Sequence, residues 1–230
     1  MKNILLPGLL SVALLIACSQ ETEQVFPSAT PDETILKSAS SQAENKTNPF
    51  DTVGAHYRGL LTEYQDGGYS PASFTEATAI VETIIGNKAV AIDADTESQL
   101  SEILSNPYES LTAVLEGSGL SPEAGEYLAT FIDDFATLRQ LPFATAYPEI
   151  TTLENNVSSS VTLPEYDKRV ILTITSLARY SLDHGCCEDT DWETSVGNIV
   201  AATAGAVSDG DKAIHYLLLT RITQHENIVF

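Results

Sequence analysis

Basic residues are scarce in this sequence, which has 11 Lys and Arg against 32 Asp and Glu and a formal net charge of −21 at pH 7. Proteins that bind nucleic acid gain most of their affinity when Lys and Arg neutralise phosphates. A surface with so few cations is also repelled by anionic lipid headgroups. The composition therefore predicts no nucleic-acid partner and no membrane contact made through basic side chains.

Cysteine is equally scarce: Cys18 lies near the start, and Cys186 and Cys187 are adjacent. Consecutive α-carbons are about 3.8 Å apart, which is below the usual range for a disulfide. The sequence also has no Cys-x-x-Cys pair of the kind that lowers the pKa of a thiolate, so we expect no thiol redox enzyme. Cys186 and Cys187 are interpreted first as free buried thiols. A strained bond between them and a bridge between two chains are the alternatives.

Long apolar runs are absent apart from one of about 13 residues, from Ile4 to Ile16, which Pro7 interrupts. A helix that spans a membrane needs about 20 apolar residues, so this run is too short for an anchor. It follows the positive residue Lys2 and precedes small residues, which is the plan of a secretory signal. The sequence therefore predicts that residues 1–17 are a signal peptide that is cleaved.

The last four residues of this region, Leu15-Ile16-Ala17-Cys18, resemble the lipobox of bacterial lipoproteins, with a branched apolar residue, a small residue and then cysteine. The resemblance implies that diacylglycerol is attached to the Cys18 thiol, that the signal is removed, and that the new amino terminus is acylated. Two or three acyl chains anchor a protein stably, because each buried methylene contributes about 0.8 kcal/mol and one chain alone is marginal. We therefore expect lipid on Cys18 to hold the protein on its membrane. The alternative is an ordinary cleaved signal.

The residues after Cys18 indicate where such a lipoprotein would be sorted. Ser19 stands where an aspartate would favour retention at the inner membrane, and Gln20-Glu21-Thr22-Glu23 resembles the acidic export signals of Bacteroidota surface lipoproteins. We expect a place in the cell envelope, at the outer membrane, with surface exposure left open. Loss of the signal removes Lys2 and no acidic residue, so the mature chain has 10 basic and 32 acidic residues and a charge of −22.

Residues 18–47 are rich in Ser, Thr, Glu, Gln and Ala, and their few large apolar residues show no sustained period. That composition is typical of a flexible tether. A random coil of this length has an end-to-end distance of about 30 Å. Residues 48–230 are long enough to bury a core, and we expect them to form one helical domain.

Helix starts are well marked within residues 48–230. Three segments place a capping side chain before a proline and an acidic residue: Asn48-Pro49-Phe50-Asp51, Asn106-Pro107-Tyr108-Glu109 and Ser121-Pro122-Glu123. Two pairs have capping-box spacing: Ser73 with Glu76, and Thr190 with Glu193.

Apolar residues at helical spacing predict helices over 49–65, 73–86, 97–105, 107–116, 122–139, 147–156, 164–184, 191–207 and 211–227. A short strand is expected only at Ala89 to Ile92, so the fold class is all-α, a single bundle of about seven to nine helices.

The pattern of apolar residues also indicates which segments are buried. In residues 164–184 the apolar side chains surround the helix instead of forming one stripe, so we expect this helix at the centre of the bundle. Residues 194–208 carry no charge and place Gly197, Ala201 and Gly205 four residues apart. Small residues at this spacing let a second helix approach closely. Close packing inside the bundle is the favoured interpretation, and a membrane-active helix is the alternative.

One short segment, residues 183–191, combines metal-ligating residue types: His184, two adjacent cysteines and several carboxylates. Structural zinc sites usually take cysteines two to four residues apart and a second pair of ligands from elsewhere. We interpret the segment instead as a turn in which Gly185 ends one helix and Thr190 caps the next. No metal, cofactor or catalytic residue is assigned here.

Other candidate ligands are dispersed. His56 is far in the sequence from His215 and His225, which are ten residues apart. Asp93-Ala94-Asp95-Thr96-Glu97 begins like a calcium loop but lacks the glycine that the EF-hand turn needs at its sixth position. We interpret these acidic residues as the start of a helix, where they favour the positive end of its dipole.

A second resemblance is carried by Asn48-Pro49-Phe50-Asp51-x-Val53-Gly54-x-His56 and by the later segment after Trp192, which is rich in Gly and Ala. Together they resemble uncharacterised helical lipoproteins of Bacteroidota. Where that family has an aspartate before the small residues of the late helix, this chain has Ala202. The resemblance carries no activity over to this chain.

Most of the marked residues are explained by folding, so the first hypothesis is a non-enzymatic envelope lipoprotein. Its helical domain would bind a protein or another envelope component, and the sequence does not identify a small-molecule ligand. One alternative is a metal-dependent or hydrolytic enzyme with its site near His184 and the acidic residues that follow. Another is a bacteriocin-like protein or toxin that acts through the Gly and Ala helix.

Overall fold

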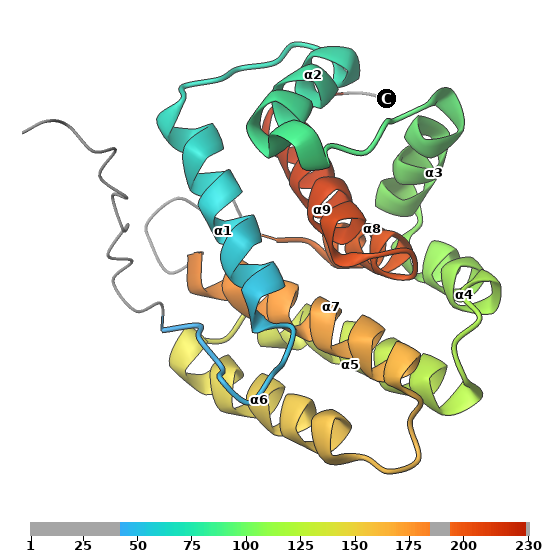
Figure 1. Ribbon diagram of the computed structural model, residues 1–230. Helices are drawn as coiled ribbons and strands as arrows, with labels where there is room; N and C mark the ends of the chain where they lie inside the picture. Colours follow the sequence, from blue (N-terminus) through green and yellow to red (C-terminus); the bar gives the residue numbers. More distant parts are fainter. Residues whose placement is uncertain (1–41, 185–193, 229–230) are drawn as a thin grey trace, which may run out of the picture. The chain divides into compact units, whose positions relative to one another are not determined.

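Regular structure is helical throughout residues 42–184 and 194–228, which are the residues that the computed structural model describes (Figure 1). This part of the chain forms nine α-helices and one short 3-10 helix, and it contains no strand. In chain order the elements are α1 (Asp51–Asp66), α2 (Phe74–Ile85), η1 (Gly86–Lys88), α3 (Ala94–Ser105), α4 (Pro107–Gly117), α5 (Pro122–Leu138), α6 (Phe143–Ser159), α7 (Glu165–His184), α8 (Val196–Ala206) and α9 (Gly210–His225). The expected all-α fold is confirmed. The predicted signal peptide and most of the predicted tether lie outside the described residues.

Two helices at the centre of the bundle are buried on all sides. Every residue from 170 to 181 in α7 is buried, and so is every residue from 213 to 223 in α9. Helix α9 packs along α8, and Figure 1 shows α2 and α3 on one side of this pair and α7 on the other. Helices α5 and α6 both pack on α7. The predicted central position of residues 164–184 is confirmed, whereas the sequence does not predict that α9 is equally buried.

Two glycines allow helices to approach closely. A Cβ atom on Gly54 of α1 would lie 2.7 Å from the carbonyl oxygen of Ser176 in α7. A Cβ atom on Gly205 of α8 would lie 2.6 Å from the carbonyl oxygen of Lys212 in α9. Ala201 and Gly197 are buried on the same helix as Gly205. The small residues of α8 therefore pack inside the bundle, as expected. None of the helices in the described ranges has both the length and the apolar character that crossing a membrane requires.

Several helix starts agree with the predicted caps. The Oγ atoms of Ser73 and Ser121 accept hydrogen bonds from the backbone N–H groups of the third residue after each. Asp93 caps α3 in the same way, through the backbone N–H of Thr96 at 2.8 Å. This hydrogen bond lowers the pKa of the Asp93 carboxyl. The interpretation of Asp93 as the start of a helix is confirmed.

Several predicted boundaries are wrong. Helix α3 begins at Ala94 instead of residue 97. Helix α6 begins at Phe143 instead of residue 147, and Pro148 lies inside it. Helix α8 begins at Val196, after a capping box formed by Ser195 and Asn198. The expected box at Thr190 lies outside the described residues. Residues 89–92 are not a strand, because no second strand lies beside them; Val90 instead donates its backbone N–H to a histidine of α9.

The folded domain begins earlier than the predicted boundary at residue 48. Ala43 is fully buried, and Asn45 is 8% exposed. The backbone N–H of Asn45 donates to Asp51, and its side-chain amide donates to Glu154. The tether assigned to residues 18–47 is therefore too long at its carboxyl end, because these bonds hold residues 43–47 on the domain.

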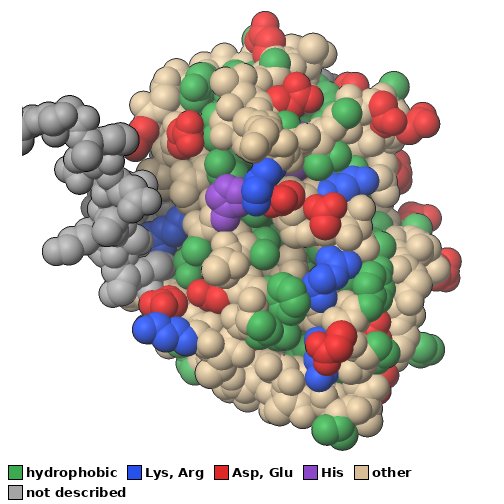
Figure 2. Space-filling model, viewed as in Figure 1, with side chains coloured by type: hydrophobic (Ala, Val, Ile, Leu, Met, Phe, Trp, Pro, Cys, Tyr) green, Lys and Arg blue, Asp and Glu red, His purple; other side chains and the backbone are tan. Residues whose placement is uncertain are grey.

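Acidic side chains dominate part of the domain surface. Figure 2 shows them along the upper and right-hand edges of the view, where Figure 1 places α2, α3 and α4. The few Lys and Arg of this face lie near its middle and at its left-hand edge, several of them beside an acidic side chain. Lys88, for example, lies 3.1 Å from Asp211. Exposed pairs of this kind contribute little to stability.

Candidate functional site

The residues singled out in the sequence are only partly described by the structure. Cys18, the predicted lipid attachment site, lies outside the described residues, and so do both members of the Cys186–Cys187 pair. The acidic residues that follow them up to residue 193 lie outside as well. His184 is the last residue of α7, and its side chain is not described. The hypothesis of a metal site in this segment therefore stays a prediction.

The other three histidines do not converge on one site. His56 is half-buried on α1. His215 and His225 both lie on α9, ten residues apart, which corresponds to about 15 Å along a helix. Within residues 42–184 and 194–228, no group of three or more His, Cys, Asp or Glu side chains is placed to hold a metal ion.

His215 is fully buried and makes one hydrogen bond. Its Nδ1 accepts the backbone N–H of Val90 at 3.1 Å, so the ring proton of the neutral form is on Nε2. That Nε2 has no hydrogen-bond partner in the described part of the chain. Burial lowers the pKa of His215 to about 4. The ring is therefore neutral at physiological pH and acts as an acceptor for the segment between η1 and α3.

A cluster of charged side chains lies in the core where α1, α6 and α7 meet, and we call it the Arg179 cluster. Its members are Asn45, Asn48, Asp51, Glu154, Arg179 and Tyr180. The guanidinium Nη2 donates to Glu154 at 3.1 Å and to Asp51 at 2.6 Å, and Nε donates to Glu154 at 3.3 Å. The side chains of Arg179 and Glu154 are both 0% exposed.

Neutral donors complete the shell around the two carboxylates. The Asn48 amide donates to Glu154 at 2.8 Å and to the carbonyl of Leu172 at 2.9 Å. The Tyr180 hydroxyl donates to Asp51 at 3.0 Å. Hydrogen bonds of this kind offset part of the desolvation cost of buried charges. The Asn48 amide therefore bridges α6 and α7. Its Oδ1 accepts the backbone N–H of Phe50 at 2.8 Å, but Phe50 and not Asn48 is the N-cap residue of α1.

Electrostatic effects within the cluster keep Arg179 charged and Tyr180 neutral. Burial disfavours the charge on Arg179, but attraction to Glu154 and hydrogen bonds to Asp51 and Glu154 outweigh it and raise the pKa of the guanidinium. Burial and the nearby Asp51 charge raise the pKa of the Tyr180 hydroxyl. The cluster is closed to solvent at its centre, so a structural role explains it: it fastens residues 45–51 to α6 and α7.

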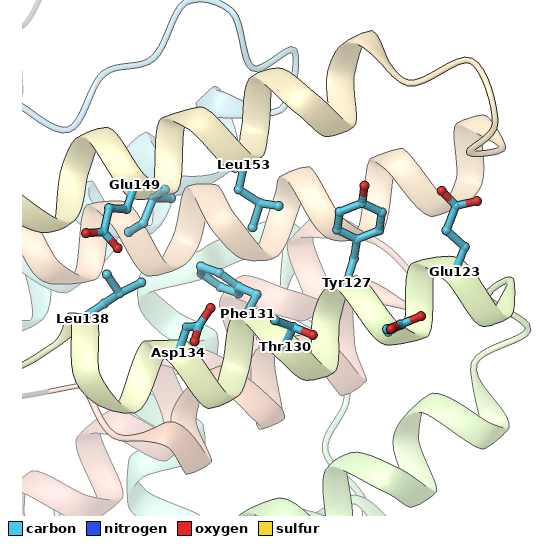
Figure 3. A pocket seen from close by; sticks show the side chains of 10 residues that line it. Glu123, Tyr127, Thr130, Phe131, Asp134, Leu138, Glu149 and Leu153 are labelled. Carbon is cyan, nitrogen blue, oxygen red and sulfur yellow. The ribbon is translucent and has the colours of Figure 1, made fainter.

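An open groove lies between α5 and α6 on the outside of the bundle, and we call it the α5–α6 groove (Figure 3). Its volume is about 520 Å³. Ten residues line it: Glu123, Glu126, Tyr127, Thr130, Phe131, Asp134, Leu138, Glu149, Ile150 and Leu153. Figure 3 shows the Tyr127 ring standing up from α5 toward α6, and Leu153 reaching down from α6 toward it.

The groove has an apolar floor and acidic edges. Phe131, Leu138 and Ile150 are buried beneath it, while Tyr127 and Leu153 are half-buried and remain partly accessible. The four carboxylates of the lining are all exposed: Glu123, Glu126, Asp134 and Glu149. The sequence predicts both helices but not the groove, because its shape depends on how α5 and α6 are spaced on α7.

Comparison with known proteins gives no further guide to the site. The chain matches no protein-family model, no curated protein and no solved structure.

Proposed function

We propose that the protein is a lipid-anchored lipoprotein of the cell envelope whose helical domain is a non-enzymatic binding module. The anchor rests on the lipobox-like residues Leu15-Ile16-Ala17-Cys18. The binding role rests on the α5–α6 groove, which is the observation that carries the proposal. An open, partly apolar groove with polar groups at its edges is the usual form of a recognition site. The outer membrane is the proposed location, and an envelope protein is the proposed partner.

The contrast between the two acidic sites favours binding over catalysis. The carboxylates of Asp51 and Glu154 accept hydrogen bonds from Arg179 in the core, so they are not free to bind another molecule. The carboxylates of the groove face solvent. Catalytic carboxylates usually sit in clefts where neighbouring side chains bury them. The groove is suited instead to attract and hold a partner.

Lipid attachment is tested by metabolic labelling with an alkyne fatty acid in a bacterial host that processes lipoproteins. The wild-type chain is expected to carry the label and to partition into detergent. Cys18→Ser is expected to lose the label. The double variant Cys186→Ser/Cys187→Ser is the matched control and is expected to keep it. A label that survives Cys18→Ser, or mass spectrometry that finds an unmodified Cys18 in the mature chain, contradicts the anchor.

Binding at the groove is tested with a photocrosslinking amino acid placed in the lipidated protein in intact cells. At Thr130, which is exposed in the groove, one discrete adduct is expected. Thr137 is exposed on the same helix and does not line the groove, so it is the control and is expected to give no such adduct. The adduct is expected to disappear in Cys18→Ser, which lacks the proposed lipid anchor. Equal adducts from both positions, or none from either, contradict binding at the groove.

A further inference from the structure

The shape of the α5–α6 groove matches the length of a helix. Its α5 side runs from Glu123 to Leu138, and this distance along a helix is about 22 Å. The lining residues of α5 recur at helical spacing on one face, and α6 lines the other side with Glu149, Ile150 and Leu153. Helices α5 and α6 both pack on α7, and the groove between them is open to a further helix.

The accessible floor of the groove selects for an apolar stripe. Tyr127 and Leu153 are half-buried, and Figure 3 shows Phe131 on α5 between Tyr127 and Leu138, below Leu153. An amphipathic helix inserts apolar residues at every third or fourth position into such a groove. A partner with only polar contacts would leave this apolar surface in water.

The edges of the groove select for positive charge. Glu123, Glu126 and Asp134 line it from α5, and Glu149 lines it from α6. In the described part of the chain, none of these four carboxylates forms an ion pair with Lys or Arg. Arg139 is the only basic residue between positions 121 and 163, and it donates to the backbone carbonyl of Thr194. The field over the groove is therefore negative along its length.

Charge argues against an occupant from this chain. Residues 18–41 contain four acidic residues and the single base Lys37. Residues 185–193 contain four acidic residues and no base. A second copy of the mature chain has a charge of −22 by the count of 10 basic and 32 acidic residues. Each of these would bring more negative charge to the groove, so the occupant must come from a cationic partner.

We propose that the α5–α6 groove binds a cationic amphipathic helix of about 15 residues, as part of a partner peptide or protein. Its apolar face packs on Tyr127 and Leu153, and its Lys or Arg side chains lie over the acidic edges. This inference rests on the proposed function, since it names the partner of the same binding module. A helix fits better than a polyamine, because all four carboxylates lie at the edges and the floor between them is apolar.

The test measures binding of fluorescent peptides to the purified mature chain carrying Cys18→Ser, in the absence of detergent. The probe is an 18-residue peptide of Leu and Lys with all Leu residues on one helical face. A scrambled isomer has the same composition without that face. The amphipathic peptide is expected to bind at least tenfold more tightly than the scrambled isomer. Equal affinities would overturn the proposal, because bulk charge alone would then explain binding.

Matched variants locate the site. The groove variant combines Glu126→Gln, Asp134→Asn and Glu149→Gln. The control variant combines Glu63→Gln, Glu116→Gln and Asp133→Asn, which are exposed positions outside the groove lining. Both variants change the net charge equally. The groove variant is expected to weaken peptide binding at least tenfold and the control variant at most twofold, and equal weakening would overturn the proposal.

A steric pair of variants gives an independent readout. Thr130→Arg places a bulky cation in the groove and is expected to abolish peptide binding. Thr137→Arg on the same helix is expected to leave it unchanged, and unchanged binding in Thr130→Arg would overturn the proposal.

Spermidine that displaces the peptide from the groove at equal concentration would show that a polyamine is the ligand, and this too would overturn the proposal. Groove crosslinks in cells without peptide binding would refute the cationic helix alone, whereas absence of both would refute the binding module as well.

Discussion

Helix α6 contributes carboxylates to two very different sites. On its inner face Glu154 is 0% exposed and bonded to Arg179, Asn45 and Asn48. On its outer face Glu149 is exposed at the edge of the α5–α6 groove. The same type of side chain therefore serves as a fixed part of the core on one face and as accessible charge on the other. The difference lies in the partners, because the core supplies a cation and the surface does not.

The comparison also separates stability from recognition. In the Arg179 cluster, each carboxylate is desolvated and depends on its partners, so losing one partner leaves an uncompensated charge. In the groove, each carboxylate is solvated, so it costs the domain no stability when no partner is bound. Substitutions in the cluster should change folding, and substitutions in the groove should change binding.

The largest effect is expected from Arg179→Met. This change leaves Asp51 and Glu154 in the core without their counter-charge, and breaking a buried pair costs about 3–5 kcal/mol. Urea unfolding followed by circular dichroism measures the loss. Arg169→Met is the control, because Arg169 is partly exposed and donates to backbone carbonyls such as Ala206. Because these hydrogen bonds are partly exposed to solvent and leave no buried charge behind, the loss in Arg169→Met is expected to be smaller, at most about 2 kcal/mol. An equal decrease in the free energy of unfolding in the two variants would show that the Arg179 cluster stabilises the fold no more than a partly exposed arginine does.

His215 is a buried titratable group without a charged partner, and it can be compared with the Arg179 cluster. Burial lowers the pKa of His215 to about 4, whereas its ordinary value is 6.5. Above pH 6.5 the ring is neutral in both the folded and unfolded chain, so it has no effect. As the pH falls toward 4, the unfolded chain takes up a proton that the folded chain does not, and stability is lost. The loss attributable to His215 reaches about 3 kcal/mol near pH 4.

His215→Gln tests this pH dependence. Glutamine keeps an acceptor for the Val90 backbone N–H but does not titrate. The free energy of unfolding is measured for both chains from pH 4 to pH 8. The difference between wild type and variant should change through this window, with the wild type losing more stability as the pH falls. Two parallel profiles would refute the role of His215.

Local signals in the sequence predict most of the fold. Ser73, Asp93 and Ser121 each satisfy a backbone N–H a few residues away, so the starts of α2, α3 and α5 are encoded within one turn. The start of α6 is not, because α6 begins at Phe143 without a side-chain cap and Pro148 lies inside the helix. The burial of α9 is also missed, since its polar residues interrupt an apolar run that only the tertiary fold explains.

Neither site could be derived from the sequence in the same way. The Arg179 cluster joins residues around positions 48, 154 and 179, and the distance between them along the chain hides their contact. A lone arginine inside the apolar run of α7 is the one signal that points to a buried partner. The groove depends on the spacing of α5 and α6, for which the chain contains no local signal.

A smaller effect is expected where the Arg179 cluster holds the start of the domain. Asn45→Ala removes a buried amide that donates to Glu154, and hydrogen bonds to charged groups contribute about 1.5–3 kcal/mol. Lys46→Ala is the neighbouring control, because the Lys46 side chain is 84% exposed. Limited proteolysis should cleave the segment before α1 faster in Asn45→Ala than in the control. Unchanged cleavage in Asn45→Ala would mean that this segment is not held by the cluster.

The smallest effect on stability is expected in the groove. The triple variant Glu126→Gln, Asp134→Asn and Glu149→Gln should change the free energy of unfolding by less than about 0.5 kcal/mol, since exposed substitutions rarely exceed this value. Any change should be an increase at low salt, because it removes repulsion in a strongly acidic domain, and added salt should reduce it. Thermal unfolding at two salt concentrations measures both, beside the control variant with Glu63→Gln, Glu116→Gln and Asp133→Asn. A loss above about 1 kcal/mol in the groove variant alone would mean that these carboxylates stabilise the fold, and the division between a structural cluster and a recognition groove would then fail.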